Sequence, residues 1–136
     1  MRALTTAICS KFLGSLLDDD VNGRFYEDEA PAGAEFPYVV YMIVSSVHER
    51  TFSECLENTS IQFSLFSSSS SSGEVKDMYD HLRILFDECS LEINGDTLIW
   101  MREENLAVMI DDILTTEGTG GVRHWAVDYE VLVSKD

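Results

Sequence analysis

The chain has 136 residues, 45% of them hydrophobic and 25% charged, which is the composition of one globular domain spanning residues 1–136. It carries 25 acidic and 9 basic side chains, so its formal charge at pH 7 is −16. This balance argues against a nucleic-acid-binding protein, which needs basic side chains to displace counterions, and against binding to an anionic membrane. No apolar run approaches the ~18 residues of a membrane span, and Lys11 interrupts the apolar stretch after Arg2, so no signal peptide is predicted.

The first half of the chain predicts one helix, an irregular arm and two strands. Apolar residues recur at helical spacing over residues 3–17, and acidic and Asn-Gly turn residues follow. Residues 24–37 contain both prolines and form an arm with at most a short extended piece. Residues 38–47 are apolar on both faces, as in a central strand or one that contacts another subunit. The polar residues 48–58 predict a loop or hairpin tip, and residues 61–65 alternate as a half-buried strand.

The second half begins with six consecutive serines, residues 67–72, which predict a flexible connection. Residues 74–89 carry apolar side chains at the clearest helical spacing in the chain. Short strands are then expected on either side of the Asn94-Gly95 turn, because Asn-Gly is typical of tight hairpins.

The C-terminal part predicts further strands. Residues 106–114 are ambiguous between strand and helix, and their loose alternation favours a strand. Glycines at positions 118, 120 and 121 predict a mobile loop, and residues 124–133 alternate as the clearest strand. The predicted fold class is α+β: a mostly antiparallel sheet of four to five strands with two α-helices packed on one face.

The side chains give no catalytic constellation. Three cysteines without a Cys-x-x-Cys motif favour a reducing compartment and thiols that fill space as small apolar groups. The three histidines, His48, His81 and His124, have no metal-ligand spacing. Residues 118–121 lack the lysine of a phosphate-binding loop, and there is no Gly-x-Ser-x-Gly motif. We therefore predict that the protein is not an enzyme and has no catalytic residue, metal or cofactor.

One motif match points to calcium. The pattern of an EF-hand calcium loop is satisfied by a set of five residues: Asp18, Asp20, Asn22, Gly23 and Glu29. The helix that leaves such a loop is missing, because Pro31 and Gly33 oppose it. An acidic turn that leads into the arm is the preferred interpretation, and a calcium-binding interaction module is kept as an alternative function.

The order of features resembles the tail terminator, or tail completion, proteins of long-tailed bacteriophages and related gene transfer agents. Residues 23–26, Gly-Arg-Phe-Tyr, stand where that family has a Gly-Arg-Val-Tyr type segment after its N-terminal helix. An Ala-Pro pair at residues 30–31 and the sequence Phe-Pro-Tyr-Val-Val-Tyr at residues 36–41 follow in the family's order. An alternating strand that ends in serines, an amphipathic helix and a final alternating aromatic strand complete the resemblance, which spans nearly the whole chain. The acidity and the polar residues 49–58 depart from the family pattern.

The resemblance implies a structural virion protein. Such proteins cap the growing tail tube as a ring, usually of six copies, end its polymerisation and present a surface to the head-tail connector or neck protein. The implied partners are therefore further copies of the chain, the tail tube protein and the connector or neck protein, at the head-proximal end of a tail assembled in the host cytoplasm. The family fold is a sheet with two helices on one side.

Simple geometry is compatible with such a ring. A domain of this length has a radius of gyration of about 14 Å, and six such bodies would leave a hole of about 35 Å, wide enough for a DNA duplex. Each copy carries a charge of −16, so an acidic bore would repel the genome and let it pass without specific binding. An acidic DNA mimic that blocks a nucleic-acid enzyme is a second alternative function.

Three segments are candidates for contacts with neighbouring copies, tube and connector: the arm 24–37, the polar segment 48–58 and the segment 115–122. Loops on a rigid sheet are the usual position of such contacts. The candidate interface residues are Arg24, Phe25, Tyr26, Phe36, Tyr38 and Tyr41.

Overall fold

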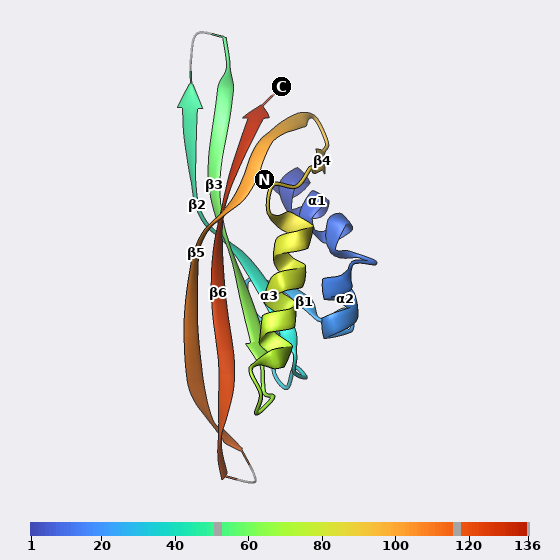
Figure 1. Ribbon diagram of the computed structural model, residues 1–136. Coiled ribbons are helices and arrows are strands. Elements are labelled where there is room, and N and C mark those ends of the chain that lie inside the picture. Colours follow the sequence, from blue (N-terminus) through green and yellow to red (C-terminus); the bar gives the residue numbers. More distant parts are fainter. Residues whose placement is uncertain (51–52, 116–117, 136) are drawn as a thin grey trace.

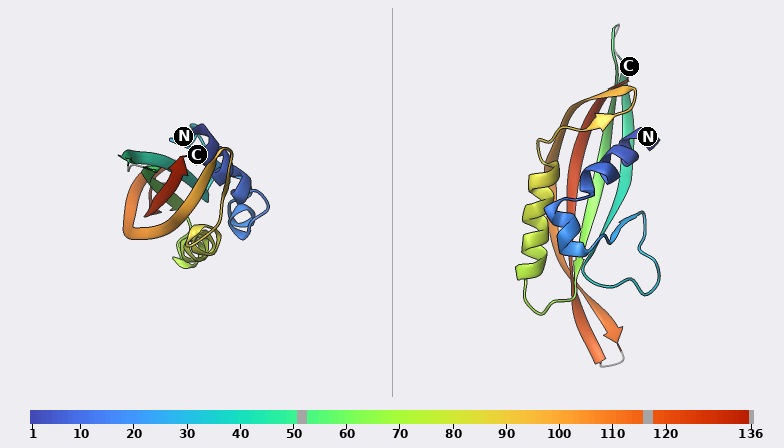
Figure 2. Two further views of the ribbon diagram at one scale, coloured as in Figure 1. Left: turned by 90° about the horizontal axis from the view of Figure 1, so that it is seen from above. Right: turned by 90° about the vertical axis from the view of Figure 1, so that its right-hand side faces the viewer.

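The computed structural model describes residues 1–50, 53–115 and 118–135. Its elements in chain order are α1 (Arg2–Phe12), α2 (Leu16–Val21), β1 (Phe25–Glu27), β2 (Tyr38–Arg50), β3 (Cys55–Ser67), α3 (Gly73–Phe86), β4 (Glu92–Ile93), β5 (Asp96–Thr115) and β6 (Gly118–Lys135). The strands form one tall, curled sheet, and the helices lie together on one of its faces (Figures 1 and 2).

The described residues form a six-stranded sheet in the order β1-β2-β3-β6-β5-β4, together with three helices. The expectation of an α+β fold with helices on one face is confirmed, but four to five strands and two helices were too few. Most neighbouring strands are antiparallel, and only the β1–β2 pair of the described sheet is parallel. Strand β4 is the short strand expected before the Asn94-Gly95 turn. The additional strand, β1, has three residues, too few to show a periodic pattern in the sequence.

The N-terminal helix is interrupted, whereas the spacing over residues 3–17 predicted one continuous helix. Gly14 adopts a φ of +78°, a left-handed conformation that ends α1. Ser15 then begins α2, and its side chain accepts a hydrogen bond from the backbone N–H of Asp18 at 3.2 Å. The apolar residues on both sides of the break still lie at compatible spacing, which is why periodicity alone did not reveal it.

Both long hairpins are longer than the sequence predicts. Residues 48–50 are paired with residues 55–57, so most of the predicted loop 48–58 belongs to β2 and β3, and residues 51–52 lie outside the described residues. Residues 106–114 form a strand, as expected, within β5. The prediction of a mobile loop at Gly118, Gly120 and Gly121 is wrong, because these residues lie in β6 and pair with β5. Residues 116–117 of the candidate segment 115–122 lie outside the described residues.

The core lies between the helices and the sheet, with Phe63 of β3 near its centre. The Phe63 ring stacks on Phe86 of α3 with centroids 4.9 Å apart and meets the edge of the Tyr129 ring of β6 at 5.5 Å. Helix α3 buries residues at positions i, i+3, i+7 and i+11, namely Val75, Met78, Leu82 and Phe86. The predicted helix over 74–89 is therefore confirmed, with its end three residues earlier, at Phe86.

The two long hairpins extend beyond this core in opposite directions. The β2–β3 hairpin projects at the end of the molecule where both chain termini lie, and the β5–β6 hairpin projects at the other end (Figure 1). The helices cover the middle of the sheet between them (Figure 2). Large parts of four strands are therefore left without a helix on either face.

Candidate interaction surface

A hollow of about 740 Å³ lies beside β4 and is lined by residues between Cys89 and Ile99. Burial raises the pKa of the Cys89 thiol, so the thiol is protonated at neutral pH and is a poor nucleophile. Of the carboxylates there, Asp96 is paired with Lys135 at 3.1 Å. Within the described ranges, no group of three or more His, Cys, Asp or Glu side chains is placed to hold a metal ion.

The first two carboxylates of the calcium-loop motif, Asp18 and Asp20, lie in helix α2 instead of a loop. Asp18 lies in α2, and its carboxylate accepts a hydrogen bond from the backbone N–H of Gly14 at 2.9 Å. Asp20 forms a hydrogen bond with His81 of α3, which links α2 to α3. Asn22 ends the helix with a φ of +52°. Two of the motif's carboxylates are thus occupied by contacts that hold the helices together.

The arm is held against the sheet by Arg24 at its start. The Arg24 side chain donates hydrogen bonds to the backbone carbonyls of Pro37 at 2.9 Å and Phe36 at 3.4 Å, and its guanidinium lies 3.8 Å from the Glu35 carboxylate. The two ends of the arm are thereby fixed to one another. The Phe36–Pro37 peptide bond is cis.

The aromatic candidate residues fall into two groups. Phe25 stacks on Phe12 and on Tyr41 with centroids 4.1 and 4.8 Å apart, on the helix side of the sheet. Tyr41 is only 2% exposed and therefore has little surface to offer another chain. Tyr26, Phe36 and Tyr38 are partly exposed and form a second aromatic cluster, with centroids 5.1 to 6.0 Å apart. Contact of these residues with another chain stays a prediction.

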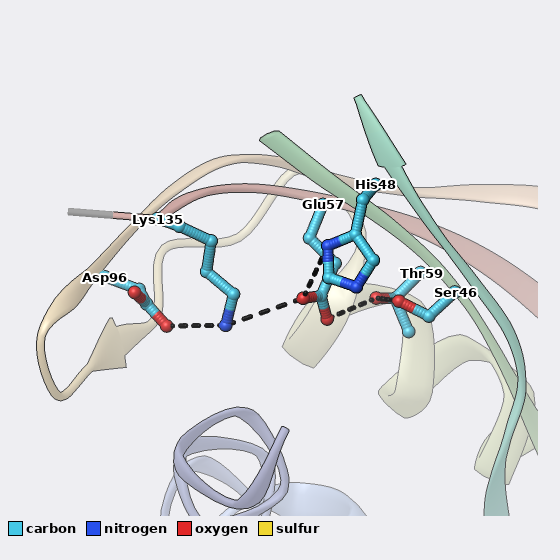
Figure 3. Close-up of polar contacts among 6 residues, drawn as sticks. All are labelled: Ser46, His48, Glu57, Thr59, Asp96 and Lys135. Atoms are coloured by element: carbon cyan, nitrogen blue, oxygen red, sulfur yellow. Dashed lines mark hydrogen bonds and ion pairs between the residues drawn. The ribbon is translucent and has the colours of Figure 1, made fainter. Parts of the chain in front are cut away.

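A polar cluster that the sequence did not predict lies where the β2–β3 hairpin extends past the end of β6 (Figure 3). Glu57 of β3 is buried, and its carboxylate accepts a hydrogen bond from Thr59 at 3.4 Å. Lys135 of β6 bridges Glu57 at 3.6 Å and Asp96 of β5 at 3.1 Å, while His48 of β2 lies 3.7 Å from Glu57. Through these contacts the cluster connects the β2–β3 hairpin to the end of β6 and the start of β5.

The hydrogen bond from Lys135 to Asp96 raises the pKa of this lysine above its usual range. Lys135 therefore remains charged throughout the neutral range, and the cluster is a paired arrangement of buried and half-buried charges. The sequence gives one weak signal for it: Glu57 and Thr59 continue the alternation of Ile61 and Phe63, which places them on the core side of β3.

The sheet face opposite the helices is polar near its centre. Tyr129 and Val131 of β6 are core residues, so the alternating Asp128 and Glu130 project from the other face. Glu130 accepts a hydrogen bond from Asn58 at 2.8 Å, which is the main cause of its lowered pKa. These contacts, together with those from Arg102 to Glu130 at 3.3 Å and from Gln62 to Asp128 at 3.0 Å, cross three neighbouring strands.

Glu104 provides a pH-dependent test of this face. Glu104 is an exposed residue, and partial desolvation, followed by the hydrogen bond with Glu130, raises the pKa of its carboxyl. A raised pKa contributes stability below the unfolded value, about 4.3, and that contribution is lost as pH rises through the folded value. Glu104→Gln should therefore raise the melting temperature at pH 7 by about 1–3 °C and leave it unchanged at pH 3.

The control for this prediction is Glu29→Gln, which alters the net charge equally at an exposed position after β1. Thermal unfolding followed by circular dichroism at both pH values measures the difference. An equal gain from Glu29→Gln at pH 7, or a gain from Glu104→Gln that persists at pH 3, contradicts the assignment.

None of the helices in the described residues is long and apolar enough to cross a membrane. The geometry so far is that of an α+β protein whose distinctive features are two projecting hairpins, a polar open sheet face and a folded arm. These features define an α+β fold class, and a fold by itself does not assign a function.

Comparisons with known proteins identify this class further. The family model described as tail completion protein gp17 matches residues 11–134. A chain in a solved structure described as the virion of a native gene transfer agent (GTA) particle is similar with a TM-score of 0.74 and 11% identity, and the match covers 96% of this chain and 94% of that chain. At this identity the likeness concerns the fold alone. The comparison with curated protein sequences gives no match.

The family match defines a structural tail protein, and the similar gene transfer agent chain shares its fold. The chain belongs to the tail completion protein gp17 family, whose model matches nearly its whole length. The resemblance inferred from the sequence is therefore confirmed, and the protein is a structural tail protein.

Proposed function

We propose that this protein forms a ring, of six copies, that caps the head-proximal end of the tail tube. The ring ends tube polymerisation and joins the tail to the head-tail connector or neck protein, and the genome passes through its bore. Each chain acts as one domain, without catalytic activity, metal or cofactor. Membership of the tail completion family supports the tail location. The polar face of the sheet opposite the helices is the observation that supports the proposed DNA channel.

The open face has the properties of a channel wall. A water-filled bore needs a surface of satisfied polar groups, and Asp128 and Glu130 are held there by Gln62 and Asn58. Each copy also brings a charge of −16 to the ring. A wall of this sign repels DNA phosphates, so the duplex crosses it without specific binding.

The arm supplies contacts outside the bore in this proposal. Its partly exposed aromatic cluster is suited to bury apolar area against the tube or the connector. The proposed contact residues are Arg24, Phe25, Tyr26, Phe36, Tyr38 and Tyr41, of which Phe25 and Tyr41 stack on one another apart from the exposed cluster.

Loss of the protein tests the capping role. Virion-producing cells without this gene should yield tails of irregular length and heads without tails, because nothing ends tube growth or joins the two parts. Electron microscopy of the released particles measures tail length and the fraction of joined particles. Joined particles with tails of normal length would overturn the proposal.

A charge reversal tests the bore. Asp128→Lys places a cation on the open sheet face and should slow DNA ejection at least about threefold at low salt, since DNA phosphates then bind transiently to the wall. Asp77→Lys makes the same charge change on an exposed position of α3, on the helix side, and should leave ejection unchanged. Equal ejection rates for the two variants and the wild type would contradict an acidic bore formed by this face.

A further inference from the structure

The two outer edges of the sheet are largely uncovered. Strand β1 pairs with β2 only at residues 39–41, and β4 pairs with β5 only at residues 96–97. Beyond these short pairings, within the described ranges, β2 from Met42 onward and the distal half of β5 have a strand neighbour on one side only. Exposed edges of this length are templates for pairing with another chain.

The covered part of the β5 edge ends at Glu103. The Met101 carbonyl accepts a hydrogen bond from the Glu88 N–H at 2.8 Å, and the Glu103 N–H donates to the Asp87 carboxylate at 3.0 Å. The two-residue period of the strand, corrected for the bulge between Glu103 and Asn105, directs the backbone groups of Leu106, Val108 and Ile110 to the same outer edge. These groups have no strand to bond within the described chain.

The β2 edge has the same character. Its backbone is used at Val39, whose N–H donates to the Arg24 carbonyl at 3.0 Å, and at Tyr41, whose carbonyl accepts from the Asp28 N–H at 2.9 Å. After the bulge between Ile43 and Ser45, the period directs the groups of Ser46 and His48 outward.

Exposed apolar side chains gather on these two edges. The described chain exposes eleven large hydrophobic residues, and six of them lie on the uncovered stretches. They are Met42, Val44 and Val47 on β2, and Val108, Met109 and Ile110 on β5. Val108 and Ile110 are 58% and 62% exposed. Proline and lysine, which protect natural edge strands, occur on neither stretch.

We propose that the uncovered β5 edge of one copy pairs with the uncovered β2 edge of the next copy and joins their sheets. This inference rests on the proposed ring and names the strands that build it. Directions alternate across β2, β3, β6 and β5, so β5 of one copy runs antiparallel to β2 of its neighbour. Two different edges make a head-to-tail contact, which closes into a ring and leaves no free edge.

The positions of the two uncovered stretches fit a closed ring. Across the ladder, Ser45 is level with Ser60, Glu130 and Arg102. The uncovered β5 stretch around Val108 lies about six residues further along, so the next copy is shifted along the strands by about 20 Å. The four long strands are about 19 Å wide together. The shift corresponds to a strand tilt of about 45°, at the upper end of the range in closed barrels.

Proline at an outward-facing position tests the pairing. Val108→Pro removes an N–H that faces outward, so it leaves the ladder with β6 intact but blocks a new strand. We expect at least tenfold fewer copies per tail, measured by mass spectrometry of tails from cells without the native gene. Val108→Thr, which keeps the N–H and the branched side chain, should assemble like the wild type.

A second variant tests the pairing even if the proline variant does not fold. Val108→Lys changes an exposed side chain, so we expect it to fold, which circular dichroism checks, and it places a natural edge-blocking charge on the strand. It should also be depleted at least tenfold from tails. Full incorporation of Val108→Lys would overturn the edge pairing. Failure of the proposed function itself has a different signature, because wild-type protein would then be dispensable for tail length.

Cross-linking identifies the partner edge. Tails that carry both Ser46→Cys and Val108→Cys, treated with a short bis-maleimide, should give a ladder of cross-linked copies up to the full ring. The wild type, with its three native cysteines, is the control. Dimers from Val108→Cys alone would show a symmetric β5–β5 contact, and dimers from Ser46→Cys alone a β2–β2 contact. Either result would overturn head-to-tail pairing.

Discussion

Replacing Phe63 with alanine is expected to lower the free energy of unfolding by about 3–5 kcal/mol. Phe63 is fully buried, and its ring contacts Phe86 of α3 and Tyr129 of β6, so the truncated side chain leaves a cavity where helix and sheet meet. For a chain of this size the melting temperature should fall by about 10–20 °C. Urea unfolding followed by tryptophan fluorescence and thermal scans measure both quantities.

Ile84→Ala is the control for this prediction. Ile84 lies on α3, the helix against which Phe63 packs, but its side chain is 73% exposed. Its removal should change the free energy of unfolding by less than about 0.5 kcal/mol, because little apolar area is lost and alanine favours helix. A Phe63→Ala protein as stable as Ile84→Ala would contradict the position of Phe63 in the core.

Replacing Lys135 with methionine is expected to cost about 2–3 kcal/mol of unfolding free energy at pH 7–9. Lys135 is the cation between Glu57 and Asp96, and without it the buried Glu57 carboxylate has lost its lysine partner and faces a second negative charge. The expected loss of unfolding free energy is smaller than for a fully buried ion pair because the Lys135 side chain is 29% exposed.

Two measurements separate this electrostatic cost from a loss of packing. The double variant Lys135→Met with Glu57→Gln should recover at least half of the loss, since the buried charge is then removed. The difference between wild type and Lys135→Met should also shrink as pH rises above the unfolded lysine value of about 10.4, because the stabilising contribution of the charged lysine is then lost. A loss that is independent of pH and is not relieved by Glu57→Gln would assign the effect to packing.

The pH dependence of the Lys135 contribution to stability follows from the direction of its pKa shift. The pKa of Lys135 is raised in the folded protein, chiefly by its hydrogen bond to Asp96. Its contribution is therefore complete below the unfolded lysine value, about 10.4, and is lost as pH rises through the folded value. The comparison at pH 7–9 thus measures the fully charged lysine.

Buried, periodic segments were predictable from the sequence. Helix α3 and the central parts of β3 and β6 bury one face against the core, so their apolar residues repeat at the period of the element. The order of these segments, with the arm and its Gly-Arg-Phe-Tyr start, was sufficient to recognise the tail completion family that the comparison shows.

The extensions of the hairpins were not predictable in this way. The last three residues of β2, 48–50, are polar and exposed, so no apolar alternation marks them as a continuation of the strand predicted over residues 38–47. Pairing with β3 decides its conformation, because the backbone groups find partners there. Strand β1 likewise exists only because Arg24 and Asp28 bring the arm beside β2.

The sequence by itself therefore determined the α+β class, the helix-covered face of the sheet and the family of this acidic protein. These depend on burial, which leaves a periodic trace along the chain. The tertiary structure alone decided where the sheet edges are left uncovered, and it alone brought Glu57 to Lys135 and Asn58 to Glu130. Such contacts depend on strand order and register, which join residues far apart in sequence and leave no local pattern.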